Sequence, residues 1–129
     1  MRIGEASRQS GVSAKMIRYY ESIGLLSPAQ RRNNDYRDFD SDDIHTLRFI
    51  HRARSLGFAM DEISKLIGLW RNKDRSSREV KVITETHITD LKSRIAAMQE
   101  MVNTLEHLAC TCHGDDRPTC PILEGLAQV

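Results

Sequence analysis

Apolar residues in the second half of the chain recur at the spacing of one long amphipathic helix. Between Ile88 and Ala109 the steps between successive apolar positions alternate between three and four residues, a heptad pattern over three repeats. A helix begun by a capping box of Ser76 and Glu79 and continuing to about Ala109 would be roughly 50 Å long. The apolar stripe consists of Ile88, Leu91, Ile95, Met98, Val102, Leu105 and Ala109.

This stripe needs a partner surface. Nothing else in the chain is large enough to bury it, so we predict a homodimer, antiparallel or parallel, in which two copies of the helix pack as a coiled coil. The alternative is that the stripe packs on its own domain.

Helix start and stop signals divide the first 75 residues into short helices. Residues 4–10 form a small helix that Gly11 ends, and Ser13 caps a second helix that continues to Gly24. Two short helices joined by Gly-Val-Ser predict a helix-turn-helix, in which the second helix reads DNA.

A hairpin and a second pair of helices follow. Residues 27–39 carry turn residues between short segments, which predicts a two-stranded hairpin with its turn at Asn33–Asp35. Helices are expected over residues 41–55 and 60–70, although Ala59 is a poor N-cap for the latter.

Composition agrees with a helical, water-soluble chain. Its 129 residues suffice for one compact domain with an extended element, and the 5% aromatic content favours aliphatic helix packing. No stretch approaches the roughly 18 apolar residues of a membrane span. The N-terminal segment has no apolar signal core, so we expect a cytoplasmic protein with no membrane partner.

Charge is distributed unevenly and points to a polyanion. Lys and Arg outnumber Asp and Glu by fourteen to ten in residues 1–75, whereas residues 76–129 hold five against eight. Lys15, Arg18 and Tyr19 share one face of the second short helix, which suits entry into the major groove. Each of these residues alone is more often a solvated charge than a DNA contact. The candidate DNA contacts are Lys15, Arg18, Tyr19, Tyr20, Arg31, Asn34, Tyr36, Arg37 and Arg54.

The run IRYYESIGLLSP (residues 17–28), then NNDYRDF (residues 33–39) and then the long helix, resembles the MerR family of transcription activators over essentially the whole chain. The resemblance implies a dimer with antiparallel long helices, in which each protomer places a winged helix-turn-helix on half of a palindrome in double-stranded promoter DNA. It also implies that the inducer makes the dimer bend and untwist the promoter for RNA polymerase. Such a deformation costs about 1–6 kcal/mol.

Three cysteines lie within eleven residues near the end of the chain. An odd number in a cytosolic protein argues against a disulfide framework and favours metal or redox chemistry. Cys112 and Cys120 bracket a seven-residue loop followed by Pro-Ile, and this spacing resembles the copper-efflux regulators of the MerR family. Cu(I), Ag(I) and Au(I) accept two thiolates. Zn(II) usually takes four ligands.

Ser77 bears on the choice of ion. The resemblance implies that divalent-metal and mercury sensors of the family have a cysteine at this position, reaching the loop of the partner. Serine removes that third thiolate, and Lys81, one turn further on, would neutralise the net charge of two thiolates and one monovalent ion. The alternatives are that Ser77 only occupies the first turn of its helix and that Lys81 is solvated.

Two other chemistries stay open at the loop. Cys110 and His113 would complete a Zn(II) set with Cys112 and Cys120, whereas Cys110 as a bystander at the end of the long helix is the simpler interpretation. The thiols would also suit a redox sensor, although oxidant-sensing relatives are expected to carry four clustered cysteines for an iron–sulfur centre. No phosphate-loop, nucleophile-elbow or HExxH motif is present, so we expect no enzyme activity.

The sequence therefore predicts a mainly α fold in three parts. A winged helix-turn-helix domain with a second helix pair spans residues 1–75, and a dimerisation helix spans residues 76–109. Residues 110–129 form a metal-binding loop and a short C-terminal helix, which starts at Pro121.

Overall fold

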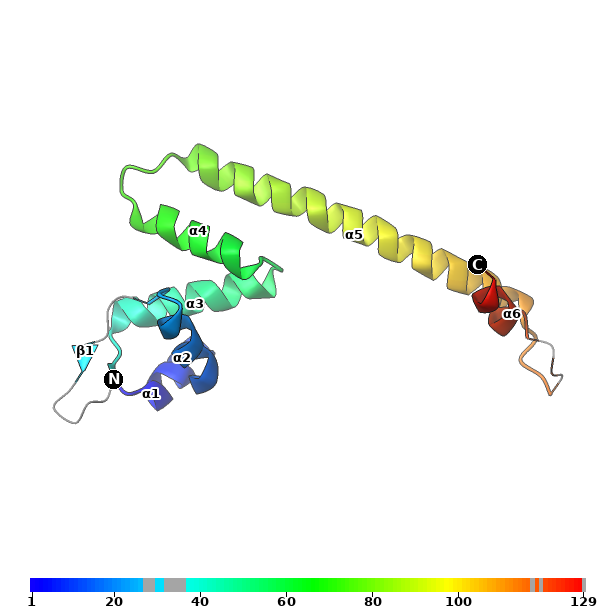
Figure 1. Cartoon of the computed structure of the whole chain (residues 1–129), viewed down its shortest axis with the longest axis horizontal. Coiled ribbons are helices and arrows are strands. Elements are labelled where there is room, and N and C mark those ends of the chain that lie inside the picture. Colours follow the sequence, from blue (N-terminus) through cyan, green and yellow to red (C-terminus); the bar gives the residue numbers. More distant parts are fainter. Residues whose placement is uncertain (27–29, 32–36, 117, 119, 129) are drawn as a thin grey trace. The chain divides into compact units, whose positions relative to one another are not determined.

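The computed structural model describes residues 1–26, 30–31, 37–116, 118 and 120–128. Helices dominate, and one of them is much longer than the others (Figure 1). This confirms the mainly α fold class. In chain order the elements are α1 (Ile3–Ser10), α2 (Ala14–Ser22), β1 (Gln30–Arg31), β2 (Arg37–Asp38), α3 (Ser41–Ser55), α4 (Met60–Arg71), α5 (Ser77–Thr111) and α6 (Pro121–Ala127).

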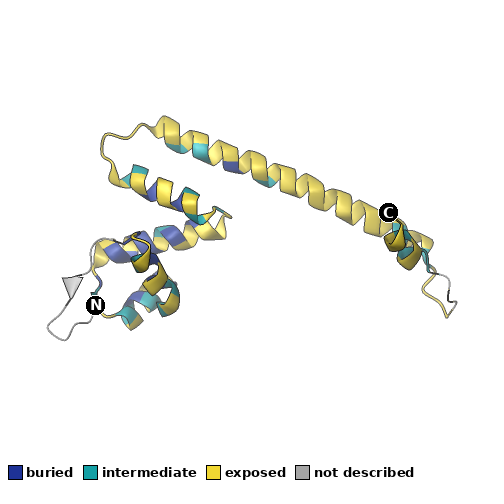
Figure 2. Cartoon of the chain, viewed as in Figure 1, coloured by how far each residue is buried: buried dark blue, intermediate teal, exposed yellow. Residues whose placement is uncertain are grey.

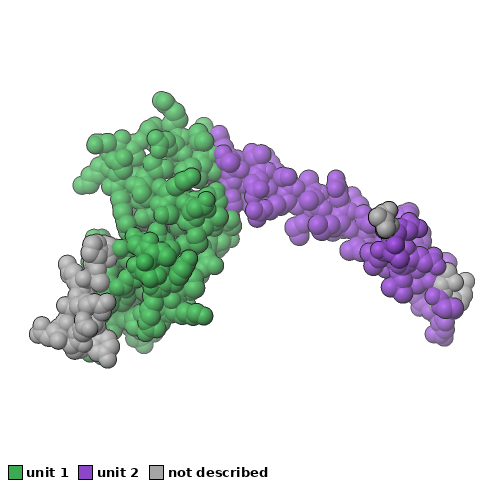
Figure 3. Space-filling model, viewed as in Figure 1, with its two compact units in different colours: residues 1–83 green, residues 84–129 purple. Residues whose placement is uncertain are grey.

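The chain forms two compact units, residues 1–83 and residues 84–129 (Figure 3). The first contains α1 to α4 and the start of α5. The second contains the rest of α5, the cysteine loop and α6.

Helices α1 and α2 form the predicted helix-turn-helix. Gly11 ends α1 in the left-handed conformation (φ 77°), which glycine adopts without steric cost, and its N–H donates to the carbonyl oxygen of Ser7 at 3.0 Å. Ser13 then caps α2, because its Oγ accepts from the N–H of Met16 at 3.2 Å. Gly11 and Ser13 thus end and begin these helices as predicted.

Strands β1 and β2 form the wing. They pair antiparallel, with Gln30 opposite Asp38 and Arg31 opposite Arg37. The predicted turn at Asn33–Asp35 lies outside the described residues.

Helices α3 and α4 complete the first unit. A capping box starts α3, in which Asp40 Oδ1 accepts from the Asp43 N–H at 2.9 Å and Asp43 Oδ2 accepts from the Asp40 N–H at 3.0 Å. At the start of α4 the side chain of Glu62 accepts from the Ala59 N–H at 3.0 Å, which partly compensates for the weak N-cap. Both helices carry buried residues, drawn dark blue in Figure 2. The core of the unit consists of Ala6, Val12, Ile17, Tyr20, Leu25, Leu26, Phe39, Ile44, Leu47, Ile50, Ala53, Ile63 and Ile67.

Helix α5 is 35 residues long and continues further than predicted. Ser76 Oγ accepts from the Arg78 N–H at 3.1 Å, which is the Ser76 side of the predicted capping box. The predicted end at Ala109 is wrong by two residues, because α5 continues to Thr111. Cys110 therefore belongs to the last turn of the helix and not to the loop.

The apolar stripe of α5 is largely uncovered. Figure 2 shows most of this helix as exposed, and Ile95, at its middle, is 65% exposed. The large stripe residues exposed in the same way are Ile88, Ile95, Met98, Val102 and Leu105.

Helix α6 folds back beside the end of α5 within the second unit (Figure 1). Gly125 of α6 lies against the half-buried side chain of Leu108. In the part of the chain that the structure describes, no helix is long and apolar enough to cross a membrane.

Candidate DNA-binding surface and metal site

Helix α2 presents three of the predicted DNA contacts to solvent. Ile17 and Tyr20 face the core, whereas Lys15, Arg18 and Tyr19 are exposed. The helix therefore has one packed face and one basic, aromatic face, which is the division that a recognition helix needs. The contacts themselves stay a prediction.

The structure assigns Tyr20 a different place from the one expected. Its side chain is only 2% exposed and lies in the core, so it is not presented to DNA. The phenol oxygen accepts a hydrogen bond from Nη1 of Arg54 on α3 at 2.8 Å. Since Arg54 itself is exposed, Tyr20 holds a predicted phosphate contact in place rather than making one.

Replacing Tyr20 by phenylalanine tests this arrangement. The ring stays in the core and only the acceptor of Arg54 is lost, so we expect DNA affinity to fall about fivefold with little change in stability. Binding to promoter DNA measured by fluorescence anisotropy checks the affinity. In an Arg54→Ala background the same change should have no further effect, and a full additional loss would show that Tyr20 does not act through Arg54.

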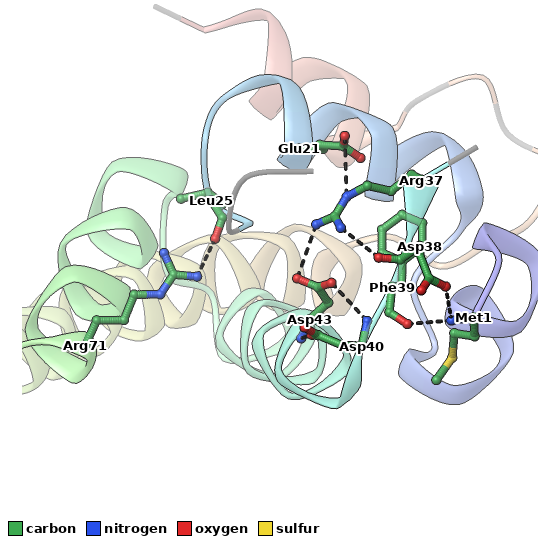
Figure 4. Close-up of polar contacts among 9 residues, drawn as sticks. All are labelled: Met1, Glu21, Leu25, Arg37, Asp38, Phe39, Asp40, Asp43 and Arg71. Atoms are coloured by element: carbon green, nitrogen blue, oxygen red, sulfur yellow. Dashed lines mark hydrogen bonds and ion pairs between the residues drawn. The ribbon is translucent and has the colours of Figure 1, made fainter. Parts of the chain in front are cut away.

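Arg37 is the second predicted DNA contact that has another role. Its side chain is 9% exposed, and its guanidinium lies 3.3 Å from Asp43 Oδ1 and 3.6 Å from Glu21 Oε1 (Figure 4). It also donates to the carbonyl oxygen of Asp38 at 2.8 Å and stacks over the ring of Phe39 at 4.8 Å. A buried guanidinium needs such partners. Because Glu21 lies in α2 and Asp43 in α3, Arg37 links the wing strand β2 to both helices.

The remaining wing contacts cannot be placed. Asn34 and Tyr36 lie outside the described residues, and only the backbone of Arg31 is described, in β1. These three residues stay predictions.

Two arginines that the sequence did not single out border the same surface. A cavity of about 920 Å³ lies between α1, α2 and β2, and Arg2 and Arg8 line it together with Arg18. Glu5 pairs with Arg8 there. A hydrogen bond from Gln9, and then the hydrogen bond and positive charge of Arg8, lower the pKa of Glu5 below its ordinary value. The available signal was one arginine just before the first helix, Arg2, and one within it, Arg8.

The structure brings Cys112 and Cys120 to one cavity. Cys112 follows the last residue of α5, and its N–H donates to the Ala109 carbonyl oxygen at 3.1 Å. Cys120 occupies the N-cap of α6, and its carbonyl oxygen accepts from the Glu124 N–H at 3.0 Å. Both thiols are free and half-buried. The cavity measures about 380 Å³, and its lining residues are Thr111, Cys112, His113, Gly114, Asp115, Cys120 and Pro121.

The donor set fits a soft ion with few ligands. Two free thiols at one small cavity are the donors that Cu(I), Ag(I) and Au(I) prefer. Among the described residues no three His, Cys, Asp or Glu side chains gather into a metal-binding cluster. Cys110 is exposed on α5 and does not line the cavity. The four-donor Zn(II) set therefore gains no support.

Ser77 and Lys81 lie in the first two turns of α5, and both are exposed. Ser77 is the first residue of the helix, as the capping bond of Ser76 requires. Whether they approach a cysteine loop depends on a second copy of the chain, so their role stays a prediction.

Known proteins share this architecture and sequence. The family described as MerR HTH family regulatory protein matches residues 1–69, and the family described as MerR, DNA binding matches residues 44–108. Heavy metal-dependent transcription regulator 2 of Rhizobium meliloti (strain 1021) is 58% identical over 99% of this chain and 87% of its own length.

Two further proteins are similar over nearly the whole chain. The HTH-type transcriptional regulator CueR of Escherichia coli O6:H1 is 35% identical over 98% of this chain and 94% of its own length. Among solved structures, the transcription regulator PbrR691 of Ralstonia metallidurans CH34 in complex with lead(II) superposes with a TM-score of 0.86. It is 29% identical, and the match covers 98% of this chain and 99% of that one.

Proposed function

The chain belongs to the MerR family of helix-turn-helix regulatory proteins, and we propose that it is a transcription activator induced by a monovalent copper-group ion on Cys112 and Cys120. The observation that carries the proposal is that both thiols, free and half-buried, line one cavity between α5 and α6. The relative that is 58% identical is named as heavy metal-dependent, which supports the metal response in its coarser form.

The donors favour a monovalent copper-group ion. Two thiolates are soft ligands, and Cu(I), Ag(I) and Au(I) are held well by such a pair. Cys112 and Cys120 would hold the ion, leaving a net charge of −1. In a dimer, Lys81 of a second copy would offset that charge, and Ser77 of that copy would offer no third thiolate.

The DNA-binding surface supplies the output. In a homodimer, two helix-turn-helix units would bind the two halves of a palindromic promoter, and the metal would shift the dimer toward a conformation that deforms the DNA for RNA polymerase. A ligand shifts such an equilibrium only by its differential affinity for the two conformations. The ion must therefore supply a difference comparable to the deformation cost of about 1–6 kcal/mol.

Competitive titration of the reduced protein tests the proposal. The protein is titrated with Cu(I), Ag(I), Au(I) and Zn(II), and promoter-specific transcription with purified RNA polymerase is scored. We expect activation by the monovalent ions and none by Zn(II). Activation by Zn(II) alone would replace the proposal with a divalent sensor, and activation of the metal-free protein by peroxide would replace it with a redox sensor.

Replacing Ser77 by cysteine is expected to widen the metal response. A third thiolate would suit Zn(II), Hg(II) and Cd(II), which prefer more ligands than Cu(I) does. Transcription scored with these ions checks the result. Ser93→Cys, an exposed position further along α5, is the matched control and should stay silent. If Ser77→Cys also ignores divalent ions, Ser77 is not a selector of metal charge.

A further inference from the structure

Gly125 lies at the point where α6 meets α5. A methyl group built at this glycine would overlap Cδ2 of Leu108, and it would lie 3.2 Å from Cδ1 and 3.3 Å from Cγ of the same side chain. The isopropyl end of Leu108 thus occupies, in its present rotamer, the space that a side chain at position 125 would need, so that either this flexible side chain or α6 would have to move. Gly68, which lies in α4, differs in this respect, because a methyl group there would meet nothing within 4 Å.

Along the chain, the contact between Gly125 and Leu108 lies within five residues of each of the two thiols. Leu108 precedes Cys112 by four residues, about one helical turn. Gly125 follows Cys120 by five residues, and Cys120 is fixed to the first turn of α6 by the Glu124 N–H bond. The separation of α5 and α6 at Gly125 therefore sets where Cys120 lies relative to Cys112.

We propose that Gly125 is a positioning residue of the two-thiol site: its missing side chain lets α6 close on Leu108 and so brings Cys120 to Cys112. This inference rests on the proposed function for its metal, but its geometry does not depend on any ion. Glycine costs helix stability relative to alanine, so helix propensity gives no reason for it inside a helix of seven residues. Close packing on Leu108 gives one.

Helix propensity and packing on Leu108 predict opposite changes in Cu(I) affinity for Gly125→Ala. If helix propensity controlled the site, Gly125→Ala would strengthen α6 and hold Cu(I) at least as tightly as the native protein. If packing controls it, the overlap with Leu108 pushes α6 away, and we expect Cu(I) affinity to fall about tenfold. Cu(I) affinity of the full-length protein is measured by competition with bicinchoninate. Gly68→Ala is the matched control and should leave it unchanged.

A second substitution tests whether Leu108 is the cause. In the double variant Gly125→Ala, Leu108→Ala the overlap is removed, so Cu(I) should bind several times more tightly than in Gly125→Ala alone. The urea midpoint and the affinity for promoter DNA of the metal-free protein should not change in Gly125→Ala, because the first unit is not touched. The proposal would be overturned if the loss of Cu(I) affinity in the double variant equalled the sum of the losses in Gly125→Ala and Leu108→Ala measured separately.

A metal-free measurement keeps the inference distinct from the proposed function. In a Cys110→Ser background, oxidised glutathione converts the Cys112 and Cys120 thiols to a disulfide and is itself reduced to two glutathione thiols. The equilibrium constant reports the effective concentration of one thiol at the other. We expect it to fall about tenfold in Gly125→Ala. An unchanged constant overturns the inference. A lowered constant in a protein that binds no Cu(I) overturns the proposed function alone.

Discussion

Serine in place of Cys112 or Cys120 is expected to abolish metal-induced transcription. Each substitution removes one of the two soft donors that line the cavity and leaves a hydroxyl, a poor ligand for a copper-group ion. We expect the Cu(I) affinity to fall by more than about 100-fold, since even residues that merely support metal ligands cost 10- to 100-fold. At a metal concentration that saturates the native protein, transcription with either variant should stay at the level seen without metal.

The same variants should still bind promoter DNA. The helix-turn-helix, the wing and the core of the first unit lie in residues 1–83, whereas the cysteine loop belongs to the second unit. Gel-shift titration without metal should therefore give a DNA affinity within about twofold of the native value, since substitutions at independent sites do not affect one another. Loss of DNA binding in the metal-free variants would count against this modular arrangement.

Cys110→Ser is the matched control for both. Cys110 is exposed in the last turn of α5 and does not line the cavity, so we expect the variant to keep its response. If Cys110→Ser silences the protein as the other two do, the site has a third thiolate, and the two-ligand proposal for a monovalent ion is wrong.

Capping side chains mark the start of α2, α3 and α5. Ser13, Asp40 and Ser76 each accept from a backbone N–H in the first turn of the helix that follows, which is a short-range effect visible in the sequence. The end of α5 was missed by two residues, because Cys-Thr-Cys carries no stop signal and Gly114 comes later. The longer helix places Cys110 in its last turn, in agreement with the interpretation of this residue as a bystander at the helix end.

Side-chain roles that depend on tertiary contacts were harder to predict. The burial of Tyr20 could have been predicted, since Ile17 lies three residues earlier on the same helix face and both face the core. That of Arg37 could not, because its partners Glu21 and Asp43 come from two other helices. The contact of Gly125 with Leu108 joins helices separated by the loop, and no local pattern reports it.

Aspartate in place of Ile95 is expected to break the protein into monomers. Ile95 lies in the middle of the heptad stripe of α5 and is 65% exposed in the single chain. A homodimer would cover it, and burial of one such side chain contributes about 1.5–3 kcal/mol. In a two-fold dimer each copy loses one buried isoleucine, so the energy loss is doubled, and two carboxylates would be buried in the interface. We expect the dimer to weaken by about 5 kcal/mol, or more than 1000-fold in its dissociation constant.

Loss of the dimer should weaken binding to the promoter, because one helix-turn-helix can bind only half of a palindrome. Sedimentation of the metal-free variant should show a monomer at micromolar protein, and the affinity for the palindromic promoter should fall at least about 100-fold. Ser93→Asp adds the same charge two residues away, on the side of α5 opposite the stripe, and should remain a native dimer. An Ile95→Asp protein that stays dimeric would mean that the stripe packs elsewhere, and the two halves of the promoter would then need another link between them.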